Sequence, residues 1–354
     1  MIAAVLEAPK KLALQEIETP ECPEGGLLLR MKACSICSTD LKMLNHGQKD
    51  LVYPRILGHE ISGVIAESRA EASGLQEGER VQISPGIACG SCISCRRGAD
   101  NQCENIQIIG FNRDGGFAEY IQVPKESVRN GGINLIPDGL SFEYAALAEP
   151  LACCLNGQQL SRVGEGDVVL IFGAGPAGCL HAMLARSRGA SAVIMAEPLE
   201  RRVSLARVSR PDVVIDPGEE DVRERIMEFT DGWGVDAMML ASRDVAVDEA
   251  LLSLLAPRGR ICLFSGLPED QAYPNLNFNT VHYRENLITG SYGCTYVQNK
   301  EAIELIASGS LDVSRLITKR VSLEEIEEGM EHAEKREGLK AVVTDKSGGD
   351  GLGR

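Results

Sequence analysis

Residues 168–178, VVLIFGAGPAG, decide the fold of this chain. The apolar half, Val168–Phe172, shows no alternation of polar and apolar residues, which is typical of a strand buried on both faces. The second half has the spacing G-x-G-x-x-G and leads into a helical segment that runs from Ala177 to about Arg188. A strand, a glycine-rich turn and a helix in this order predict a site for the pyrophosphate of a dinucleotide. The residues expected to bind that cofactor are Gly173, Gly175, Pro176, Ala177 and Gly178.

Short apolar runs and helical patterns alternate on the C-terminal side of this stretch. We expect further strands at 192–196, 213–215, 235–241, 260–264 and 286–290, with helices near 199–208, 222–229 and 245–255. Alternation at this spacing predicts βαβ units, and therefore a doubly wound parallel sheet of Rossmann type with helices on both faces. This α/β domain is expected to span residues 157–290.

The flanking sequence has a different texture. Residues 1–156 contain short β-branched runs broken by Gly and Pro, which predict a β-rich domain. After residue 290 come two amphipathic helices, 299–308 and 323–335, and a strand at 339–343. This tail is too short for a domain of its own, so we expect residues 291–354 to pack on residues 1–156.

Glu197 follows Gly178 by nineteen residues and ends the next expected strand. A carboxylate there accepts hydrogen bonds from the adenosine ribose and repels a 2′-phosphate, which favours NAD over NADP. The alternative is a carboxylate at a helix start with no ligand. Arg202 is expected to contact the cofactor as well, and with Arg201 it weakens the exclusion of NADP.

Composition excludes several functions. The chain has 354 residues, and 36 basic against 51 acidic side chains give a net charge of −15, which disfavours nucleic-acid binding. No apolar run reaches the roughly 18 residues of a membrane span. The opening residues meet Glu7 early and do not resemble a signal peptide, so we expect a cytoplasmic protein without membrane or nucleic-acid partners.

The densest cysteine cluster lies between residues 89 and 103. Four thiolates at this spacing wrap one tetrahedral Zn²⁺, and because all four positions are occupied, the site is expected to be structural. Buried free cysteines and an iron–sulfur cluster are the alternatives, and a zinc-ribbon binding module has the same signature. The predicted ligands are Cys89, Cys92, Cys95 and Cys103.

A second set of metal-ligating types is dispersed along the chain as Cys37, His59, Glu60 and Glu149. Each has an ordinary interpretation alone, as a small buried thiol, a core imidazole or a helix-entry carboxylate. Together they suit an open catalytic Zn²⁺. Sequence spacing does not show whether they converge.

These motifs resemble those of the zinc-dependent medium-chain alcohol dehydrogenases, and in particular of the sorbitol and threonine dehydrogenase branch. The resemblance rests on Gly58-His59-Glu60, the four-cysteine cluster, Gly115–Tyr120 and the dinucleotide turn, which occur in this order. It implies a GroES-like catalytic domain beside the Rossmann domain, with one catalytic and one structural zinc in each subunit.

The resemblance also implies roles for single residues. Cys37 and His59 match zinc ligands, Glu60 matches a ligand of the same branch, and Glu149 matches a carboxylate that binds zinc directly or through water. Asp40 matches the carboxylate that orients the zinc-bound imidazole. Thr39 matches the hydroxyl that accepts the alcohol proton.

The implied activity is hydride transfer between a secondary alcohol of polyol or sugar type and NAD. The runner-up is oxidation of a 3-hydroxy amino acid, as in L-threonine 3-dehydrogenase, because Ser291-Tyr292-Gly293 lacks the arginine–tyrosine pair of sorbitol dehydrogenases. Lys42 and Asn156 stand where many relatives have histidine. A zinc-free quinone or enone reductase on the same fold and an NAD sensor without turnover are the remaining alternatives.

The expected strand at 286–290 would end the Rossmann sheet, and an apolar edge strand is prone to pair with another chain. In the resembling family this edge pairs across a two-fold axis. We therefore expect a homodimer or a homotetramer.

Overall fold

The computed structural model describes residues 1–345, which form two compact units. The first unit consists of Met1–Ala152 together with the chain from Cys294 onward, and the second is Cys153–Gly293. Residues 346–354, which belong to the first domain in the sequence prediction, lie outside the described residues. Among residues 1–345, no helix is both long and apolar enough to cross a membrane.

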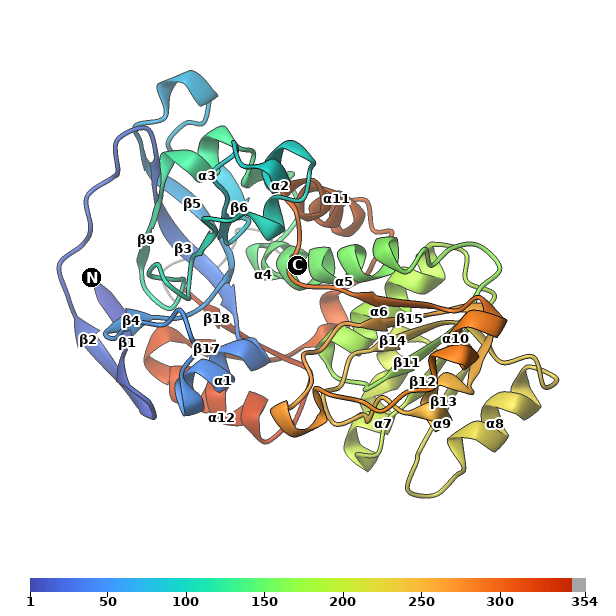
Figure 1. Ribbon diagram of the computed structural model, residues 1–354. Coiled ribbons are helices and arrows are strands. Elements are labelled where there is room, and N and C mark those ends of the chain that lie inside the picture. The colour runs from blue at the N-terminus through green and yellow to red at the C-terminus, as the bar shows by residue number, and fades with distance from the viewer. Residues whose placement is uncertain (346–354) are drawn as a thin grey trace. The chain divides into compact units, whose positions relative to one another are not determined.

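The second unit is built on one six-stranded sheet with the order β13-β12-β11-β14-β15-β16 (Figure 1). Every neighbouring pair is parallel, and this order is that of a doubly wound dinucleotide-binding sheet, so the prediction of a Rossmann sheet is confirmed. Its elements are β11 (Val168–Phe172), α6 (Pro176–Ser187), β12 (Ala192–Ala196), α7 (Glu200–Ala206), β13 (Val213–Ile215), α8 (Val222–Phe229), β14 (Val235–Leu240), α9 (Glu249–Leu252), β15 (Leu255–Leu263), α10 (Phe278–Arg284) and β16 (Leu287–Gly290).

One part of this unit differs from the sequence prediction. The helix expected at 245–255 is reduced to the single turn of α9, because Leu255 already pairs with Val235 in the sheet. The pairing register then shifts between Val235 and Ala237, and Arg258 adopts a positive φ of 63°. A strand with such an irregular start lacks the regular sequence pattern of buried residues from which a strand is predicted.

The first unit is β-rich. Its largest sheet has the order β10-β6-β5-β3-β18-β17, with β9 also paired to β3, and two smaller sheets have the orders β2-β1-β4 and β7-β8. The strands are β1 (Ile2–Ala8), β2 (Lys11–Glu16), β3 (Leu27–Ser35), β4 (Arg55–Ile56), β5 (Glu60–Ser68), β6 (Arg80–Ile83), β7 (Gly86–Ile87), β8 (Gln107–Ile108), β9 (Tyr120–Val123), β10 (Ile133–Leu135), β17 (Ile317–Ser322) and β18 (Lys340–Thr344).

The helices of this unit are α1 (Ser38–His46), α2 (Ile93–Arg96), α3 (Lys125–Arg129), α4 (Phe142–Ala146), α11 (Tyr296–Ala307) and α12 (Ile326–Glu334). Figure 1 shows the late strand β18 beside the early strand β3, with β17 next to β18, and Val343 of β18 pairs antiparallel with Cys34. The tail thus completes the sheet of the first unit, and β18 brings residues near position 340 next to residues 34–36.

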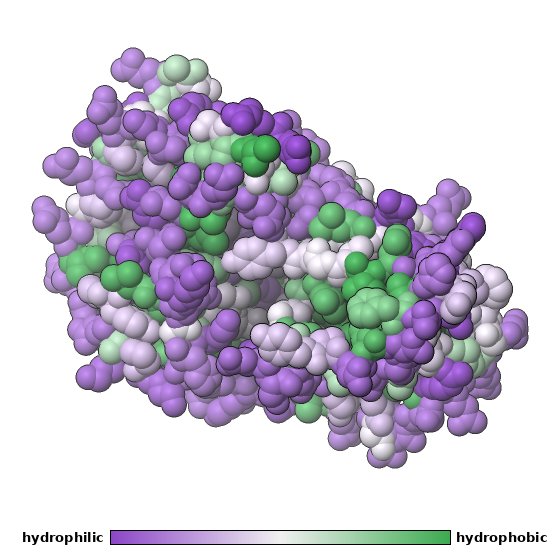
Figure 2. Space-filling model, in the orientation of Figure 1, coloured by the Kyte–Doolittle hydropathy of each residue, from purple (hydrophilic) through white to green (hydrophobic). Residues whose placement is uncertain are grey.

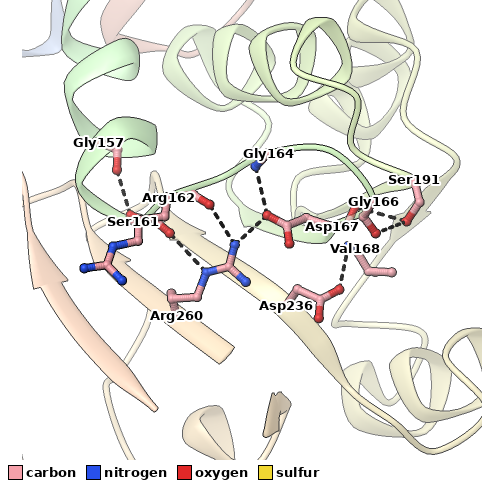
Figure 3. A network of polar contacts seen from close by, with 10 residues as sticks. All are labelled: Gly157, Ser161, Arg162, Gly164, Gly166, Asp167, Val168, Ser191, Asp236 and Arg260. Carbon is pink, nitrogen blue, oxygen red and sulfur yellow. Dashed lines mark hydrogen bonds and ion pairs between the residues drawn. The ribbon is translucent and has the colours of Figure 1, made fainter. Parts of the chain in front are cut away.

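Helix α5 (Ala148–Leu160) begins in the first unit and ends in the second. Figure 3 shows how its C-terminal end is fixed: the Arg260 guanidinium donates to the carbonyl oxygens of Ser161 (3.1 Å) and Arg162 (2.9 Å). The same guanidinium pairs with Asp167, 2.5 Å away, just before β11. A side chain of β15 therefore satisfies carbonyl groups that the helix end leaves unpaired.

Candidate metal and cofactor sites

The four cysteines at 89–103 converge. Their Sγ atoms all lie within 4.8 Å of one another, with Cys92 3.5 Å from Cys95 and Cys89 4.0 Å from Cys95. Zn–S bonds of about 2.3 Å in a tetrahedron place sulfurs about 3.8 Å apart, so these separations fit one zinc ion. Cysteine thiolate is also the ligand type that closed structural zinc sites use.

Backbone groups prepare this cluster for thiolates. The N–H groups of Ser91 and Cys92 donate to Cys89 Sγ at 3.5 and 3.3 Å, and Cys103 Sγ accepts from the N–H groups of Cys89 and Asn105. The donors at Ser91 and Cys92 lower the pKa of Cys89 to about 6. These donors thus favour the thiolate form of Cys89, whereas burial raises the pKa of Cys95 to about 12.

A second cluster forms from residues far apart in the sequence. Donor atoms of Cys37, His59 and Glu60 lie within 4.8 Å of one another. Cys37 directly precedes α1, while His59 and Glu60 stand where the chain enters β5. One sulfur, one nitrogen and one oxygen donor match the ligand types of a catalytic zinc site, which has three protein ligands.

Asp40 accepts hydrogen bonds from three groups of this cluster and its flanking backbone. Its carboxylate is fully buried and accepts from His59 Nδ1 (3.2 Å), the Cys37 N–H (2.8 Å) and the Gly58 N–H (3.2 Å). The contact to Nδ1 leaves Nε2 as the imidazole nitrogen available to a metal. Burial opposes a charged imidazole, but Asp40 raises the pKa of His59 well above its ordinary value.

Gly58 allows His59 and Glu60 to serve the same cluster. Adjacent strand residues normally point to opposite faces, so the chain must bend here. Gly58 has a φ of +92°, and a Cβ at this position would come within 2.8 Å of Cys34 Sγ. Only glycine meets both conditions without strain.

Lys340 is the residue of this cluster that the sequence analysis missed. Its Nζ lies 2.5 Å from both carboxylate oxygens of Glu60, and the two side chains are 4% and 0% exposed. Burial alone would lower the pKa of Lys340, but Glu60, followed by Cys37 and Glu149, outweighs burial and raises it. Lys340 thus compensates the buried negative charge of Glu60.

Glu149 and Thr39, also predicted for the catalytic centre, are not among the three donors that converge. Glu149 is buried at the start of α5, and its carboxylate lies within 4.8 Å of Cys294 Sγ. Thr39 is half-buried in the first turn of α1, and Lys42 and His46 are exposed on the same helix. The structure thus groups Cys37, His59 and Glu60 directly, and Glu149 with Cys294.

The glycine-rich turn joins β11 to α6 in the second unit. Gly175 precedes α6 in an extended conformation, and in the described part of the chain no side chain caps the helix, so its first N–H groups meet no capping oxygen there. A Cβ at Gly178 would come within 1.8 Å of the Gly173 carbonyl oxygen, so this close packing requires glycine. The turn has the form that accepts a pyrophosphate.

Glu197 and Arg202 adjoin this turn. The buried Glu197 carboxylate accepts from the Ala174 N–H (2.7 Å) and the Leu199 N–H (3.0 Å). Arg202 Nη1 lies 3.2 Å from the point that a Cβ of Gly175 would occupy. A carboxylate and a guanidinium therefore both lie next to the glycine-rich turn.

Comparison with known proteins identifies the family of this chain. Residues 23–132 match the model of the alcohol dehydrogenase GroES-like domain, and residues 176–308 match that of zinc-binding dehydrogenases. L-threonine 3-dehydrogenase of Pyrococcus furiosus is 34% identical over 326 residues, which cover 90% of this chain and 91% of the relative. The chain belongs to the zinc-type medium-chain alcohol dehydrogenase family.

Other members are similar over the same length. Sorbitol dehydrogenase of Bacillus subtilis is 32% identical over 97% of both chains. A Sinorhizobium meliloti 1021 protein described as a zinc-binding dehydrogenase and bound to NADP has a TM-score of 0.87 and 30% identity, over 97% of this chain and 99% of its own. The predictions of a dehydrogenase and of a GroES-like domain beside a Rossmann domain are confirmed.

Proposed function

We propose that this chain oxidises a secondary alcohol of polyol or sugar-alcohol type, with a catalytic zinc and NAD. The observation that carries this proposal is the convergence of Cys37, His59 and Glu60 on one point, with Asp40 behind the imidazole. A zinc-free quinone or enone reductase has no use for such a donor set. A zinc-ribbon module would need only the four-cysteine cluster, and an NAD sensor would need only the glycine-rich cofactor turn.

The residues present fit the implied cofactors, and each has a separate task. When bound, zinc polarises the alcohol oxygen and the nicotinamide accepts the hydride. Cys37, His59 and Glu60, with Glu149 directly or through water, would hold the metal, while Asp40 holds His59 in the tautomer that exposes Nε2. Thr39, two residues after Cys37, would take the alcohol proton.

Glu197 is the basis for proposing NAD. Its carboxylate is fixed by the backbone of the cofactor turn, and a 2′-phosphate beside it would meet a buried negative charge. Arg202 acts in the opposite sense, and the Sinorhizobium meliloti neighbour binds NADP. Cofactor preference is therefore a balance between these two side chains.

The proposed substrate class rests on the relatives of this chain. Sorbitol dehydrogenase and D-altritol 5-dehydrogenase are each 32% identical to it. L-Threonine oxidation is the second candidate, favoured by the 34% identity to threonine dehydrogenase and by Ser291 in place of an arginine. A panel of polyols, sugar alcohols and L-threonine, followed by NADH absorbance, decides between them.

Two matched variants test the division of the metal sites. Cys37→Ser should abolish turnover while NAD binding and folding are largely kept. Cys92→Ser makes the same chemical change in the other cluster and should mainly lower stability, because closed zinc sites contribute to folding. Turnover retained in Cys37→Ser would contradict the proposed catalytic centre, and unfolding of both variants would contradict the division.

We further propose that two chains pair along the edge strand β16. In Figure 2 hydrophobic side chains, in green, gather on the face of the second unit at the right of the view. Leu287 and Ile288 of β16 are 40% and 36% exposed, and Tyr283 just before them is 80% exposed. Pairing of this edge would cover apolar groups that water otherwise meets.

The reaction is proposed to take place in the cytoplasm. None of the twelve cysteines forms a disulfide, although Cys92 and Cys95 stand close together. Free thiols in this number are typical of a reducing compartment.

A further inference from the structure

The chain that leaves the four-cysteine cluster leads directly to the cluster of Cys37, His59 and Glu60. At its start the Ile106 N–H donates to the Cys103 carbonyl oxygen at 3.1 Å, and the Ile106 side chain packs against the cysteines. Strand β8 then pairs with β7, which fixes the next two residues. The loop that follows β8 carries an aromatic side chain whose ring contacts His59.

This loop lies directly on the backbone of Gly58, the residue before His59. A Cβ at Gly110 would come within 2.5 Å of the Gly58 carbonyl oxygen, and one at Gly115 within 2.2 Å, so both close approaches require glycine. The Gly116 N–H donates to the same oxygen at 2.8 Å. The loop is therefore packed tightly against the backbone that positions the imidazole.

The aromatic side chain of the loop is Phe111. Its own N–H donates to the Ile108 carbonyl oxygen at 3.0 Å. Three residues later the Asp114 carboxylate accepts from the Arg55 guanidinium (2.7 Å) and from the Ile56 N–H (3.2 Å). Hydrogen bonds on both sides of Phe111 thus define where its ring lies.

The rings of Phe111 and His59 are perpendicular. Their centroids are 5.2 Å apart and their planes meet at 85°, the edge-to-face arrangement that aromatic rings favour. The two residues are 9% and 5% exposed. Asp40 bonds to Nδ1 of the imidazole at 3.2 Å, but one hydrogen bond leaves a ring able to tilt. The Phe111 ring limits that tilt.

We propose that Phe111 is a positioning residue for His59 as a metal ligand; this rests on the proposed catalytic zinc. A metal site needs directed donors, so Nε2 has to point to the place that Cys37 Sγ and the Glu60 carboxylate also reach. Groups that orient a metal-ligating side chain contribute about 10- to 100-fold to metal affinity. Phe111 supplies part of this contribution through ring packing, and Asp40 supplies the hydrogen bond.

The test compares three variants of the full-length chain. Phe111→Leu keeps an apolar side chain but removes the flat ring, and Phe111→Tyr keeps the ring. Phe142→Leu is the matched control, because Phe142 is 7% exposed in the same unit and its ring also contacts a polar side chain, with the Arg80 guanidinium 4.5 Å from its centroid. Zinc is titrated into metal-free protein against a chelator of known affinity, and the zinc that Cys37→Ser fails to bind is assigned to the His59 site.

Phe111→Leu should raise the zinc Kd of the His59 site about tenfold, because the imidazole loses the contact that limits its tilt. Phe142→Leu should leave that Kd unchanged while lowering the Tm of the zinc-free protein by a similar amount. Phe111→Tyr should bind zinc as wild type does. With Co²⁺ in place of zinc, the d–d absorption that Cys37→Ser lacks should change in Phe111→Leu and not in Phe142→Leu, since it reports ligand geometry.

Equal zinc Kd values in Phe111→Leu and wild type would overturn the inference. So would an equal loss of affinity in Phe142→Leu, or a loss in Phe111→Tyr as large as in Phe111→Leu. A wild-type chain that binds zinc at the His59 site but oxidises no alcohol of the panel would instead refute the proposed function, and the Kd values would still decide the role of Phe111. If Phe111→Leu fails to fold, Phe111→Met, which also lacks the ring, decides in the same way.

Discussion

His181 makes the second unit sensitive to acid. Its side chain is fully buried on α6, where the ring stacks edge-on against Phe264 with centroids 4.5 Å apart. Nδ1 lies 3.4 Å from Gln158 Nε2, and no hydrogen-bond partner among residues 1–345 reaches Nε2. Burial, helped by the charge of Arg188, lowers the pKa of His181 from 6.5 to about 3.

The direction of the pH effect follows from this shift. The folded chain holds His181 neutral, while the unfolded chain takes up a proton below about pH 6.5. The contribution to stability is therefore fully present above pH 6.5 and is lost as the pH falls toward 3. Between pH 7.5 and pH 5.0 the loss is about 2 kcal/mol, at about 1.36 kcal/mol for each unit below the unfolded pKa.

His181→Leu removes the titrating group and keeps an apolar side chain in the same place. Urea unfolding at pH 7.5 and 5.0, followed by fluorescence of Trp233, reports on the correct unit, because the only tryptophan of the chain lies there. The drop in unfolding free energy between the two pH values should be about 2 kcal/mol smaller in the variant. His282→Gln, an exposed histidine of the same unit, is the control and should behave as wild type. An equal drop in wild type and His181→Leu would refute the reasoning.

Three further predictions concern the candidate sites and the edge strand. Lys340→Met leaves the Glu60 carboxylate buried without its partner, so the free energy of unfolding of the zinc-free protein should fall by about 3–5 kcal/mol. Added zinc should then raise the Tm of the variant more than that of wild type. An equal rise in Tm for both proteins in calorimetry would contradict the pairing of Lys340 with Glu60. Glu197→Gln keeps an oxygen that accepts from the Ala174 N–H but removes the negative charge. The ratio of kcat/KM with NAD to kcat/KM with NADP should therefore fall about tenfold. An unchanged ratio would mean that another residue selects the cofactor. Ile288→Lys should split the dimer with zinc content intact, and light scattering of wild type near 38.1 kDa would refute the dimer itself.

The sequence predicted those parts of the fold that depend on residues close together in the chain. The glycine turn at 173–178 and the cysteine cluster at 89–103 are each defined by residue spacings within about fifteen residues. The parallel sheet followed from apolar runs, since strands buried on both faces are nearly continuous in apolar residues. The short helix α9 was overestimated, because the start of β15 is irregular and bears exposed Pro257 and Arg258.

What the sequence did not predict depends on contacts between distant residues. Lys340 and Glu60 are 280 positions apart, and a lysine in an apolar run such as 339–343 gives no sign of a buried partner. Asn156 donates to the carbonyl oxygen of Gly293, which is likewise 137 positions away. His181 looks like an ordinary helix residue until the packing of α6 against α5 and Phe264 is known.

The central claim is that this chain holds two separate zinc sites, of which only one is catalytic. Elemental analysis of metal-replete protein tests it most directly, with Cys37→Ser measured alongside wild type. We expect two zinc ions for each wild-type subunit and one for the variant. A single zinc in wild-type protein, unchanged by Cys37→Ser, would contradict it.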